Sequence, residues 1–380
     1  MKIAVIGAGL MGRAALYDIS RNNSVEQVGI FDVDGNLAAE IATRFGSGKA
    51  VVGGLDATDE DRVTSLLKDY DAALACTTYQ HNPGLTRAAI KAGCHLVDLG
   101  GNNDVVQTQI QMNDAAKQAG VIVIPDCGLA PGMVSLMVAD GVNKLDKVSG
   151  VKIRVGGLPQ SPRPPLNYQI VFSVEGLINE YWEPCTILEN GQKTTVAPMT
   201  GLEELEFDGI GQLEAFYTSG GTSTLPDTYG GEIGFLDYKT IRYPGHCRPM
   251  RTMLELGLGS RKPVNLDGVE VEPRALFKAL LSRNLTHVGP DMVLVRVSVE
   301  GTKDNAEKSI IYEIVDRQDP GTELTAMMRT TAFPAAIIAQ MAALGQITAR
   351  GVKPQEIAVK PSLFLPQLDK RGIKLTITEK

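Results

Sequence analysis

The sequence has few of the residues that build metal centres and disulfide frameworks. Its 380 residues include five cysteines and four histidines, and no two cysteines form a C-x-x-C pair. We therefore expect free thiols in a reducing compartment at Cys76, Cys94, Cys127, Cys185 and Cys247. The histidines show no metal-ligand spacing, so no metal site is expected.

Excess basic charge and long apolar runs are also lacking. A net charge of −7 argues against nucleic acid or an anionic membrane as a partner. No apolar run reaches the roughly 18 residues that a membrane helix needs. Because the first strand-like run begins at residue 2, we expect no secretory leader and a cytoplasmic location. Hydrophobic content of 43% is typical of a globular protein, and the length predicts two domains.

What the sequence does contain is a glycine-rich stretch between two strand-like runs. Residues 2–6 are apolar and β-branched, as in a buried parallel strand. A G-x-G-x-x-G turn follows at residues 7–12, then a helical pattern to Asn22 and a second strand from Val25 that ends on Asp32. This order of strand, glycines, helix, strand and terminal acid is the dinucleotide-binding arrangement. The alternative is a flexible glycine loop in some other α/β protein.

Each residue of this arrangement has a separate physical role. Gly7 allows the tight turn, Gly9 lets backbone N–H groups approach a pyrophosphate, and Gly12 lets helix and strand pack closely. Asp32 stands twenty residues after Gly12, where an acid accepts hydrogen bonds from a ribose 2′-hydroxyl. Because an acid there would repel a 2′-phosphate, we expect NAD rather than NADP as the cofactor.

Strands and helices continue to alternate up to residue 125. Strand-like runs occur at 50–52, 71–76, 95–99 and 121–125, between helical patterns at 36–45, 59–68 (with Thr58 as expected N-cap), 83–92 and 105–119. This alternation predicts a doubly wound parallel sheet of order 3-2-1-4-5-6, which binds ligands at the carboxyl ends of its strands. The loops expected there are 77–81, 98–102 and 126–128. The expected cofactor-binding residues are Gly7, Gly9, Leu10, Met11, Gly12, Asp32, Asp56, Thr77, Thr78 and Tyr79.

The pattern changes after residue 148. Strand-like segments at 148–155, 168–171, 186–188, 213–217, 236–243, 292–299 and 308–315 accompany helical patterns at 173–182, 248–256 and 273–282. They predict a second, α+β domain with a mixed or antiparallel sheet. Residues 156–165 and 219–234 are rich in Gly or Pro and are expected to be loops. The longest helical pattern, 323–344, contains Pro334, which should kink it. The predicted domains are 1–130, completed by 323–380, and 131–322.

Motifs in both halves resemble those of the saccharopine dehydrogenase family. They are HLVDLGGN at 95–102, CGLAPG at 127–132, VFSVEGLINEY at 171–181 and YKTIRYPGH at 238–246. Within that family, AFYTSGGTSTLP at 215–226 is most similar to the lysine 6-dehydrogenases. The resemblance implies a Rossmann domain and a catalytic domain that also carries subunit contacts, and therefore a homo-oligomer.

The resemblance also implies an activity. It is NAD-dependent oxidative deamination of the ε-amine of lysine to 2-aminoadipate 6-semialdehyde, which cyclises to piperideine-6-carboxylate, and ammonia. Relatives that act on bulkier substrates carry Trp and Pro where this chain has Phe172 and Val174, which favours the smaller substrate. The alternatives are an enzyme of the saccharopine reductase type and an NAD-binding protein without turnover.

Oxidation of an amine carbon requires the ammonium to lose a proton first, so a base and a clamp for the carboxylate are needed. The candidate proton carriers are Asp98, Lys239 and His246. Asp98 could instead hold its glycine loop, and His246 could instead be an ordinary surface residue. The expected substrate-binding residues are Arg242, Tyr243 and Thr222. The alternative is an internal salt bridge for Arg242, simple packing for Tyr243 and a position in a flexible loop for Thr222.

Two acids complete the candidates. Glu175 and Glu180 are five residues apart and so not on one helical face, which argues against a paired acid and base. We expect a structural role for Glu180.

Overall fold

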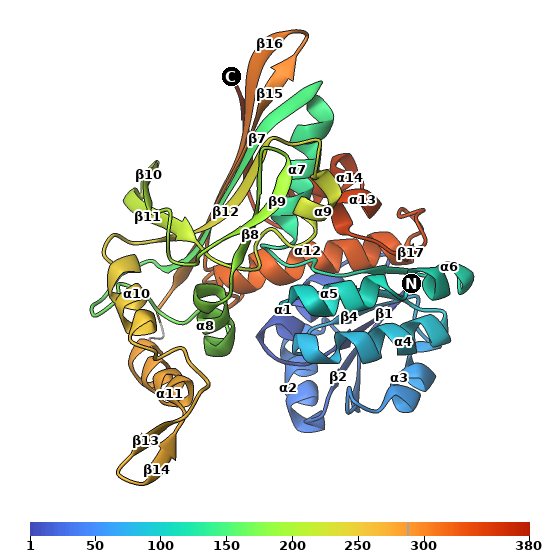
Figure 1. Ribbon diagram of the computed structural model, residues 1–380. Coiled ribbons are helices and arrows are strands. Elements are labelled where there is room, and N and C mark those ends of the chain that lie inside the picture. The colour runs from blue at the N-terminus through green and yellow to red at the C-terminus, as the bar shows by residue number, and fades with distance from the viewer. Residues whose placement is uncertain (287–288) are drawn as a thin grey trace. The chain divides into compact units, whose positions relative to one another are not determined.

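The computed structural model describes residues 1–286 and 289–380, which divide into two compact units (Figure 1). Unit 1 comprises Met1–Lys144 and Met328–Leu375, and unit 2 comprises Leu145–Met327 and Thr376–Lys380. The chain returns from unit 2 to unit 1 inside helix α12 (Ala326–Ala343), which contains Pro334. The predicted domains ended earlier, at residue 130, so helix α7 (Met133–Lys144) had been placed in the second domain.

Unit 1 is built on a seven-stranded parallel sheet of order β17-β6-β5-β4-β1-β2-β3. The strands are β1 (Lys2–Ile6), β2 (Gln27–Asp32), β3 (Ala50–Gly54), β4 (Ala72–Ala75), β5 (His95–Asp98), β6 (Ile122–Ile124) and β17 (Gly351–Val352). The predicted doubly wound sheet is confirmed, and β17 extends it beside β6. Because helices cover a parallel sheet on both faces, strands β1 and β4 are apolar at nearly every position.

The other helices of unit 1, besides α7 and most of α12, follow the strands they connect. They are α1 (Leu10–Ser20), α2 (Gly35–Phe45), α3 (Glu60–Leu67), α4 (Asn82–Ala92), α5 (Asn103–Ile110), α6 (Asn113–Gln118), α13 (Gln355–Ala358) and α14 (Pro361–Asp369), with a 3₁₀ turn, η1 (Tyr79–His81). Helix α1 packs beside α2, and α4 lies between α3 and α5 (Figure 1).

Two local predictions in unit 1 were wrong. Asp59, not Thr58, caps α3, because the Asp59 carboxylate accepts from the backbone N–H of Arg62 at 3.0 Å. The hydroxyl of Thr58 instead donates to Asp56. The single helix expected over 105–119 is two helices, because Met112 turns the chain with its N–H bonded three residues back to Gln109 rather than four.

Unit 2 is built on a nine-stranded mixed sheet with the path β10-β11-β12-β7-β15-β16-β18, in which β8 joins β12 to β9. The strands are β7 (Lys147–Pro159), β8 (Cys185–Glu189), β9 (Gln192–Val196), β10 (Glu203–Phe207), β11 (Gly211–Tyr217), β12 (Phe235–Arg242), β15 (Asp291–Lys303), β16 (Ala306–Arg317) and β18 (Leu375–Glu379). Strands β12 and β7 pair in parallel, whereas β15 pairs antiparallel with both β7 and β16. The predicted mixed sheet is confirmed.

Helices cover part of this sheet. Helices α8 (Val174–Trp182), α10 (Cys247–Glu255) and α11 (Pro273–Leu285) form an apolar cluster that includes Phe216 of β11 and Tyr168. The two-stranded hairpin of β13 (Val264–Leu266) and β14 (Val269–Val271) precedes α11 (Figure 1). Helix α9 (Leu225–Tyr229) is the remaining helix of unit 2 among the described residues.

Several segments of unit 2 differ from prediction. Residues 156–159 were expected to be loop but continue β7, because Gly156 and Gly157 pair with β15 on a ladder already set by the preceding residues. Residues 168–171 were expected to be a strand but pair with none; Ile170 donates instead to the C-terminal carbonyl of α11 at Leu285. Strands β9 and β10 and helix α9 were not predicted, since their short patterns carry little periodicity.

Candidate cofactor and substrate sites

The glycine turn of unit 1 has the geometry that a phosphate cradle requires. Gly7 has a φ of +103°, and a Cβ on Gly12 would lie 1.8 Å from the Gly7 carbonyl oxygen, so neither position has room for a side chain. Gly9, in contrast, has no atom within 4 Å of an added Cβ. Gly9 is also the N-cap of α1 and provides no side-chain cap. The space beside Gly9 at the N-terminus of α1 is therefore open, and an anion is favoured at such a helix end.

Asp32 lies at the carboxyl end of β2 and is joined to this turn. Its Oδ2 accepts from the backbone N–H of Ala8 at 2.7 Å, and its Oδ1 accepts from that of Asp34 at 3.0 Å. Asp32 thus has two roles: it fixes the turn, and it presents a partly exposed carboxylate beside it.

A pocket of about 210 Å³ opens at this edge of the sheet. Its lining includes Gly7, Asp32, Asp56, Thr77, Thr78 and His81. The hydroxyl of Thr77 is buried there with no hydrogen-bond partner in the described structure. Asp56 accepts from the backbone N–H of Thr58 at 2.9 Å and from its hydroxyl at 2.7 Å, which lowers the pKa of the Asp56 carboxyl. Carboxylates for ribose hydroxyls and free N–H groups for a pyrophosphate fit a nicotinamide dinucleotide.

The other predicted cofactor residues lie around the turn. Leu10 and Met11 begin α1, and Leu10 is half exposed. Tyr79 packs against Gly101, whose added Cβ would lie 3.1 Å from the Tyr79 ring.

A larger hollow of about 560 Å³ on unit 2 is a weaker candidate for a ligand site. It is lined by polar and charged residues of β7, β15, β16 and the chain end, such as Lys147, Glu300 and Lys380. No apolar side chain lines it. Ligand sites are mostly apolar with a few placed polar groups, so this hollow lacks the composition of one.

Asp98 is fully buried in unit 1, and protein groups occupy its carboxylate. Oδ1 accepts from the backbone N–H groups of Gly100 at 2.7 Å and Asp126 at 3.2 Å, and Oδ2 accepts from Gln109 at 2.7 Å. Burial raises the pKa of Asp98, and these hydrogen bonds partly offset the rise. Through these contacts, Asp98 holds together the two loops that follow β5 and β6.

In unit 2, the predicted residues of the 238–246 motif divide between the two faces of the sheet. Side chains alternate along a strand, so Lys239 and Arg242 of β12 point to opposite faces. Tyr243 packs with Ile241 on the face of Lys239, and its hydroxyl donates to the carbonyl of Pro159 at 2.9 Å. Arg242 shares its side with His246. The structure therefore does not bring these four residues together.

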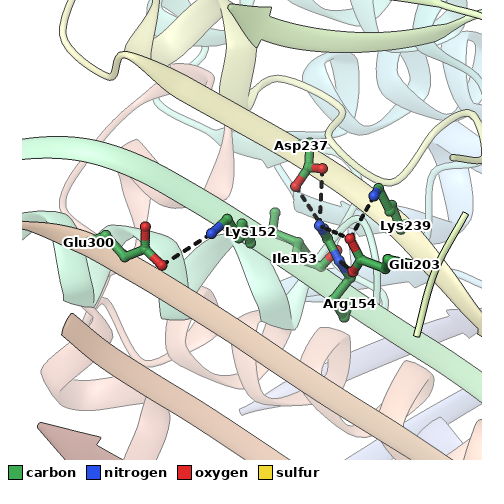
Figure 2. A network of polar contacts seen from close by, with 7 residues as sticks. All are labelled: Lys152, Ile153, Arg154, Glu203, Asp237, Lys239 and Glu300. Carbon is green, nitrogen blue, oxygen red and sulfur yellow. Dashed lines mark hydrogen bonds and ion pairs between the residues drawn. The ribbon is translucent and has the colours of Figure 1, made fainter. Parts of the chain in front are cut away.

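Lys239 belongs to an ion-pair network on its face (Figure 2). Its ammonium lies 2.6 Å from Oε2 of Glu203 and 4.8 Å from the centre of the Tyr217 ring. Glu203 also pairs with Arg154, which binds Asp237 through two hydrogen bonds of 2.6 and 3.0 Å. The Lys239 ammonium thus lies against a carboxylate rather than in an open site.

Arg242 lies on the other face and is 2% exposed. Its Nε donates to the Tyr181 hydroxyl at 2.8 Å, its Nη1 donates to the Ile241 carbonyl at 2.9 Å, and its guanidinium lies 4.6 Å from the centre of the Tyr168 ring. Among residues 1–286 and 289–380, no carboxylate lies within ion-pair distance of this guanidinium, and Nη2 makes no hydrogen bond. The internal salt bridge that was the alternative for Arg242 is therefore not found there.

His246 is fully buried beside Arg242, so the alternative of a surface position is wrong. Its Nδ1 lies 3.0 Å from the Leu166 carbonyl, which can only accept, so Nδ1 carries the proton. Nε2 then accepts from the Tyr181 hydroxyl at 3.2 Å. Burial and the nearby Arg242 charge lower the pKa of His246 to about 3. A histidine that stays neutral in this way is not a base poised near neutrality, and its position instead orients Tyr181.

The third predicted substrate residue, Thr222, is also buried. Its hydroxyl donates to the Thr186 carbonyl at 3.1 Å. This contact ties the glycine-rich loop to β8.

Glu180, for which the sequence indicated a structural role, is a half-buried acid that makes no ion pair among the described residues. It lies on α8 three residues after the buried Leu177, so the helix turns it towards the interior. Its charge interacts with Arg242 and with three tyrosines, and burial raises its pKa to about 7 despite Arg242. Its spacing from Leu177 is the sequence signal for this half-buried position. Glu175, the other acid of α8, pairs instead with Arg274.

The parallel sheet, its open glycine turn and the pocket beside Asp32 are the features of a unit that binds a nicotinamide dinucleotide. Two family models match the chain: the saccharopine dehydrogenase NADP binding domain over residues 3–124 and the saccharopine dehydrogenase C-terminal domain over residues 128–373. The chain belongs to the saccharopine dehydrogenase family.

Similar proteins support this assignment. The alpha-aminoadipic semialdehyde synthase of Rattus norvegicus is 23% identical over 281 residues, which are 69% of this chain and 29% of that protein. The saccharopine dehydrogenase [NADP(+), L-glutamate-forming] of Schizosaccharomyces pombe is 24% identical over 67% of this chain and 57% of its own. The carboxynorspermidine synthase of Vibrio cholerae is 24% identical over a match that covers 100% of this chain and 97% of that protein. The chain thus spans under a third of the rat protein and little more than half of the yeast one.

A solved structure shares the fold. The saccharopine dehydrogenase (L-Glu forming) of Saccharomyces cerevisiae has a TM-score of 0.82 at 17% identity and covers 100% of this chain and 99% of its own. Among the described residues, no helix has the length and apolar character needed to cross a membrane. The expected homo-oligomer and cytoplasmic location stay predictions.

Proposed function

We propose that this chain is an NAD-dependent dehydrogenase that oxidises the carbon bearing the ε-amine of lysine, with 2-aminoadipate 6-semialdehyde and ammonia as products. The observation that carries the proposal is Arg242. A buried cation without a carboxylate partner is costly, and a carboxylate ligand would complete it. The planar guanidinium suits bidentate binding of a carboxylate, which every amino-acid substrate carries.

The contacts of Arg242 support this role. Nε is held by Tyr181, and Tyr181 is held in turn by the neutral His246, so the guanidinium has a fixed orientation. The Nη2 group is left for a ligand. Fixed donors bind a ligand more tightly than mobile ones, because less conformational entropy is lost on binding.

The choice of NAD rests on unit 1. The dinucleotide supplies the hydride acceptor when it is bound. Asp32 and Asp56 place two carboxylates in the pocket beside the glycine turn, and a 2′-phosphate would be repelled there. The matching family model describes an NADP binding domain, so Asp32 is the feature that favours NAD in this chain.

The alternative reaction is that of the saccharopine reductase type, which the names of several relatives favour. Product analysis separates the two. With lysine and NAD, the proposed reaction gives NADH and ammonia in equal amounts. Oxidation of saccharopine with release of glutamate and no ammonia would instead identify the alternative.

The role of Arg242 has its own test. Arg242→Lys keeps the charge but loses the fork, so kcat/KM for lysine should fall roughly 10- to 100-fold while NAD affinity and the melting temperature hold. Arg296→Lys, which changes an arginine paired with Glu313 on the same sheet, is the matched control. Cadaverine is lysine without its carboxylate. If Arg242→Ala retains the wild-type preference for lysine over cadaverine, another residue holds the carboxylate.

A further inference from the structure

Glu180 is a carboxylate placed near a cation without pairing with it. Helix α8 buries Leu177, Ile178 and Tyr181, and Glu180 lies between them in the helical repeat. Its charge is felt by Arg242 and Tyr238 of β12, by Tyr181 of α8 and by Tyr168 before α8. The Arg242 guanidinium is nevertheless beyond ion-pair distance. Within the described residues, the Glu180 carboxylate accepts no hydrogen bond.

Glu175 of the same helix shows what a paired acid looks like in this unit. Its carboxylate is bound by Arg274 at 2.9 Å and also by Lys278 at 3.4 Å. These partners lower the pKa of Glu175, whereas burial raises that of Glu180. One acid of α8 therefore belongs to a structural ion-pair cluster, and the other is half-buried and has no ion-pair partner among the described residues.

A cation and a carboxylate that are neighbours but do not form an ion pair are complementary to the two charged groups of an α-amino acid. The two charged groups of such a ligand are attached to one carbon, so they need an acceptor and a donor within a few ångströms of each other. If Arg242 and Glu180 were paired, their ion pair would have to break before the ligand could bind. The rings of Tyr168 and Tyr181 lie 4.6 and 5.7 Å from the Arg242 guanidinium, and such apolar neighbours lower the local dielectric and strengthen the attraction for a ligand.

We propose that Glu180 binds the α-ammonium of the substrate whose α-carboxylate is bound by Arg242, so that unit 2 contains a subsite for the zwitterion of an α-amino acid. The inference rests on the proposed function for the role of Arg242. It adds a specificity-determining residue and defines the substrate class by its α-ammonium. It does not depend on which carbon of the substrate is oxidised.

The charge of Glu180 makes this binding dependent on pH. Below about pH 7 the carboxyl of the free protein is protonated and loses its attraction for an ammonium. The titratable groups that interact with its charge are Arg242, Tyr168, Tyr181 and Tyr238. Burial raises the pKa of each tyrosine, so none of them ionises between pH 6 and 8. Affinity for an α-ammonium should therefore fall from pH 8 to pH 6 through Glu180.

The test compares two ligands that differ only in the α-ammonium, norleucine and hexanoate, by titration calorimetry with the full chain and NADH. Neither ligand has an ε-amine, so the comparison is independent of turnover. Wild type should prefer norleucine. Glu180→Gln should lower the affinity for norleucine about tenfold or more and leave that for hexanoate unchanged. Glu180→Asp should restore part of the preference, and Glu175→Gln should leave it intact.

Three results would overturn the inference. They are an equal loss of affinity for both ligands in Glu180→Gln, an unchanged preference in that variant, or no norleucine binding by wild type. Equal loss of lysine and 6-aminohexanoate turnover with unchanged norleucine binding would make Glu180 a proton acceptor instead. Absence of lysine oxidation combined with a Glu180-dependent preference for norleucine would refute the proposed reaction and leave the subsite standing.

Discussion

Arg154 of β7 and Asp237 of β12 form a buried bidentate ion pair across neighbouring parallel strands, with Nη1 2.6 Å from Oδ1 and Nη2 3.0 Å from Oδ2 (Figure 2). Both side chains are under 10% exposed. Glu203 contacts the same guanidinium, so a single arginine organises two acids from different strands.

This pair should be essential for the stability of unit 2. Asp237→Ala leaves a buried guanidinium short of one carboxylate, and the free energy of unfolding should fall by about 3–5 kcal/mol. Urea denaturation measures the change. Lys152→Ala is the matched control, because Lys152 and Glu300 form an exposed pair in the same sheet (Figure 2), and its loss should cost less than about 1 kcal/mol. Equal losses in the two variants would contradict the expectation.

The glycines of the turn should separate binding from folding. Gly9→Val puts a side chain in open space, so the unfolding free energy should stay within about 0.5 kcal/mol while NAD binding drops below detection by calorimetry. Gly12→Ala puts a Cβ against the Gly7 carbonyl, so it should lower the unfolding free energy by roughly 1–3 kcal/mol. Normal NAD affinity in Gly9→Val would remove the phosphate-cradle interpretation.

Asp32 should select the cofactor. Asp32→Ala should raise the KM for NAD roughly 10- to 100-fold, as expected for the loss of a charged hydrogen bond, and should relax the rejection of NADP. Asp32→Asn keeps an acceptor for the N–H of Ala8 and should lose less NAD affinity while still admitting NADP. Steady-state kinetics with both cofactors measure the ratio. A wild-type preference for NADP would show that this account of Asp32 is wrong.

His246 should make the protein sensitive to acid. The unfolded chain protonates this histidine below about pH 6.5, whereas the native state keeps it neutral down to about pH 3. The unfolded state thus binds the extra proton, so stability is complete above pH 6.5 and falls by roughly 3 kcal/mol towards pH 4. Urea unfolding between pH 4 and pH 7.5 should give a shallower slope for His246→Gln. His81→Gln, outside unit 2, should keep the wild-type slope.

Glu180 should reduce stability at alkaline pH. Its carboxyl ionises near pH 4.5 in the unfolded chain and near pH 7 in the native state, so the native state binds the extra proton between these values. Stability therefore falls as pH rises from 4.5 to 7, by an amount on the order of 3 kcal/mol, and stays lower above pH 7. Glu180→Gln should melt at a higher temperature than wild type at pH 8 and at the same temperature near pH 4.5. Glu175→Gln, which breaks ion pairs, should melt lower at pH 8.

Much of unit 1 could be predicted from the sequence, because its determinants are local. The apolar run before Gly7, the glycine spacing and the acid at Asp32 lie within about thirty residues and act through the turn that they form themselves. The alternation of strand and helix then defines the sheet order up to β6. Strand β17 was not predicted, since two residues at Gly351–Val352 have no pattern of their own and become a strand only by pairing with β6.

The site of unit 2 was decided by contacts between distant segments. The sequence identified Arg242 and His246 as polar residues in one motif, but burial, tautomer and partners come from Tyr181 and Leu166, more than sixty residues away. Lys239, a candidate proton carrier, was expected at the same site as Arg242, but the alternation of side chains along β12 places it on the opposite face.

The sequence alone therefore determined the cofactor turn, the fold class and the motif that carries Arg242. Only the tertiary structure decided which charges are paired and which are not. The physical reason is that a charge in a folded chain depends on burial and on the nearest opposite charge. For Glu175 that charge is Arg274, a contact made when α8 packs on α11, whereas no opposite charge in residues 1–286 and 289–380 pairs with Glu180.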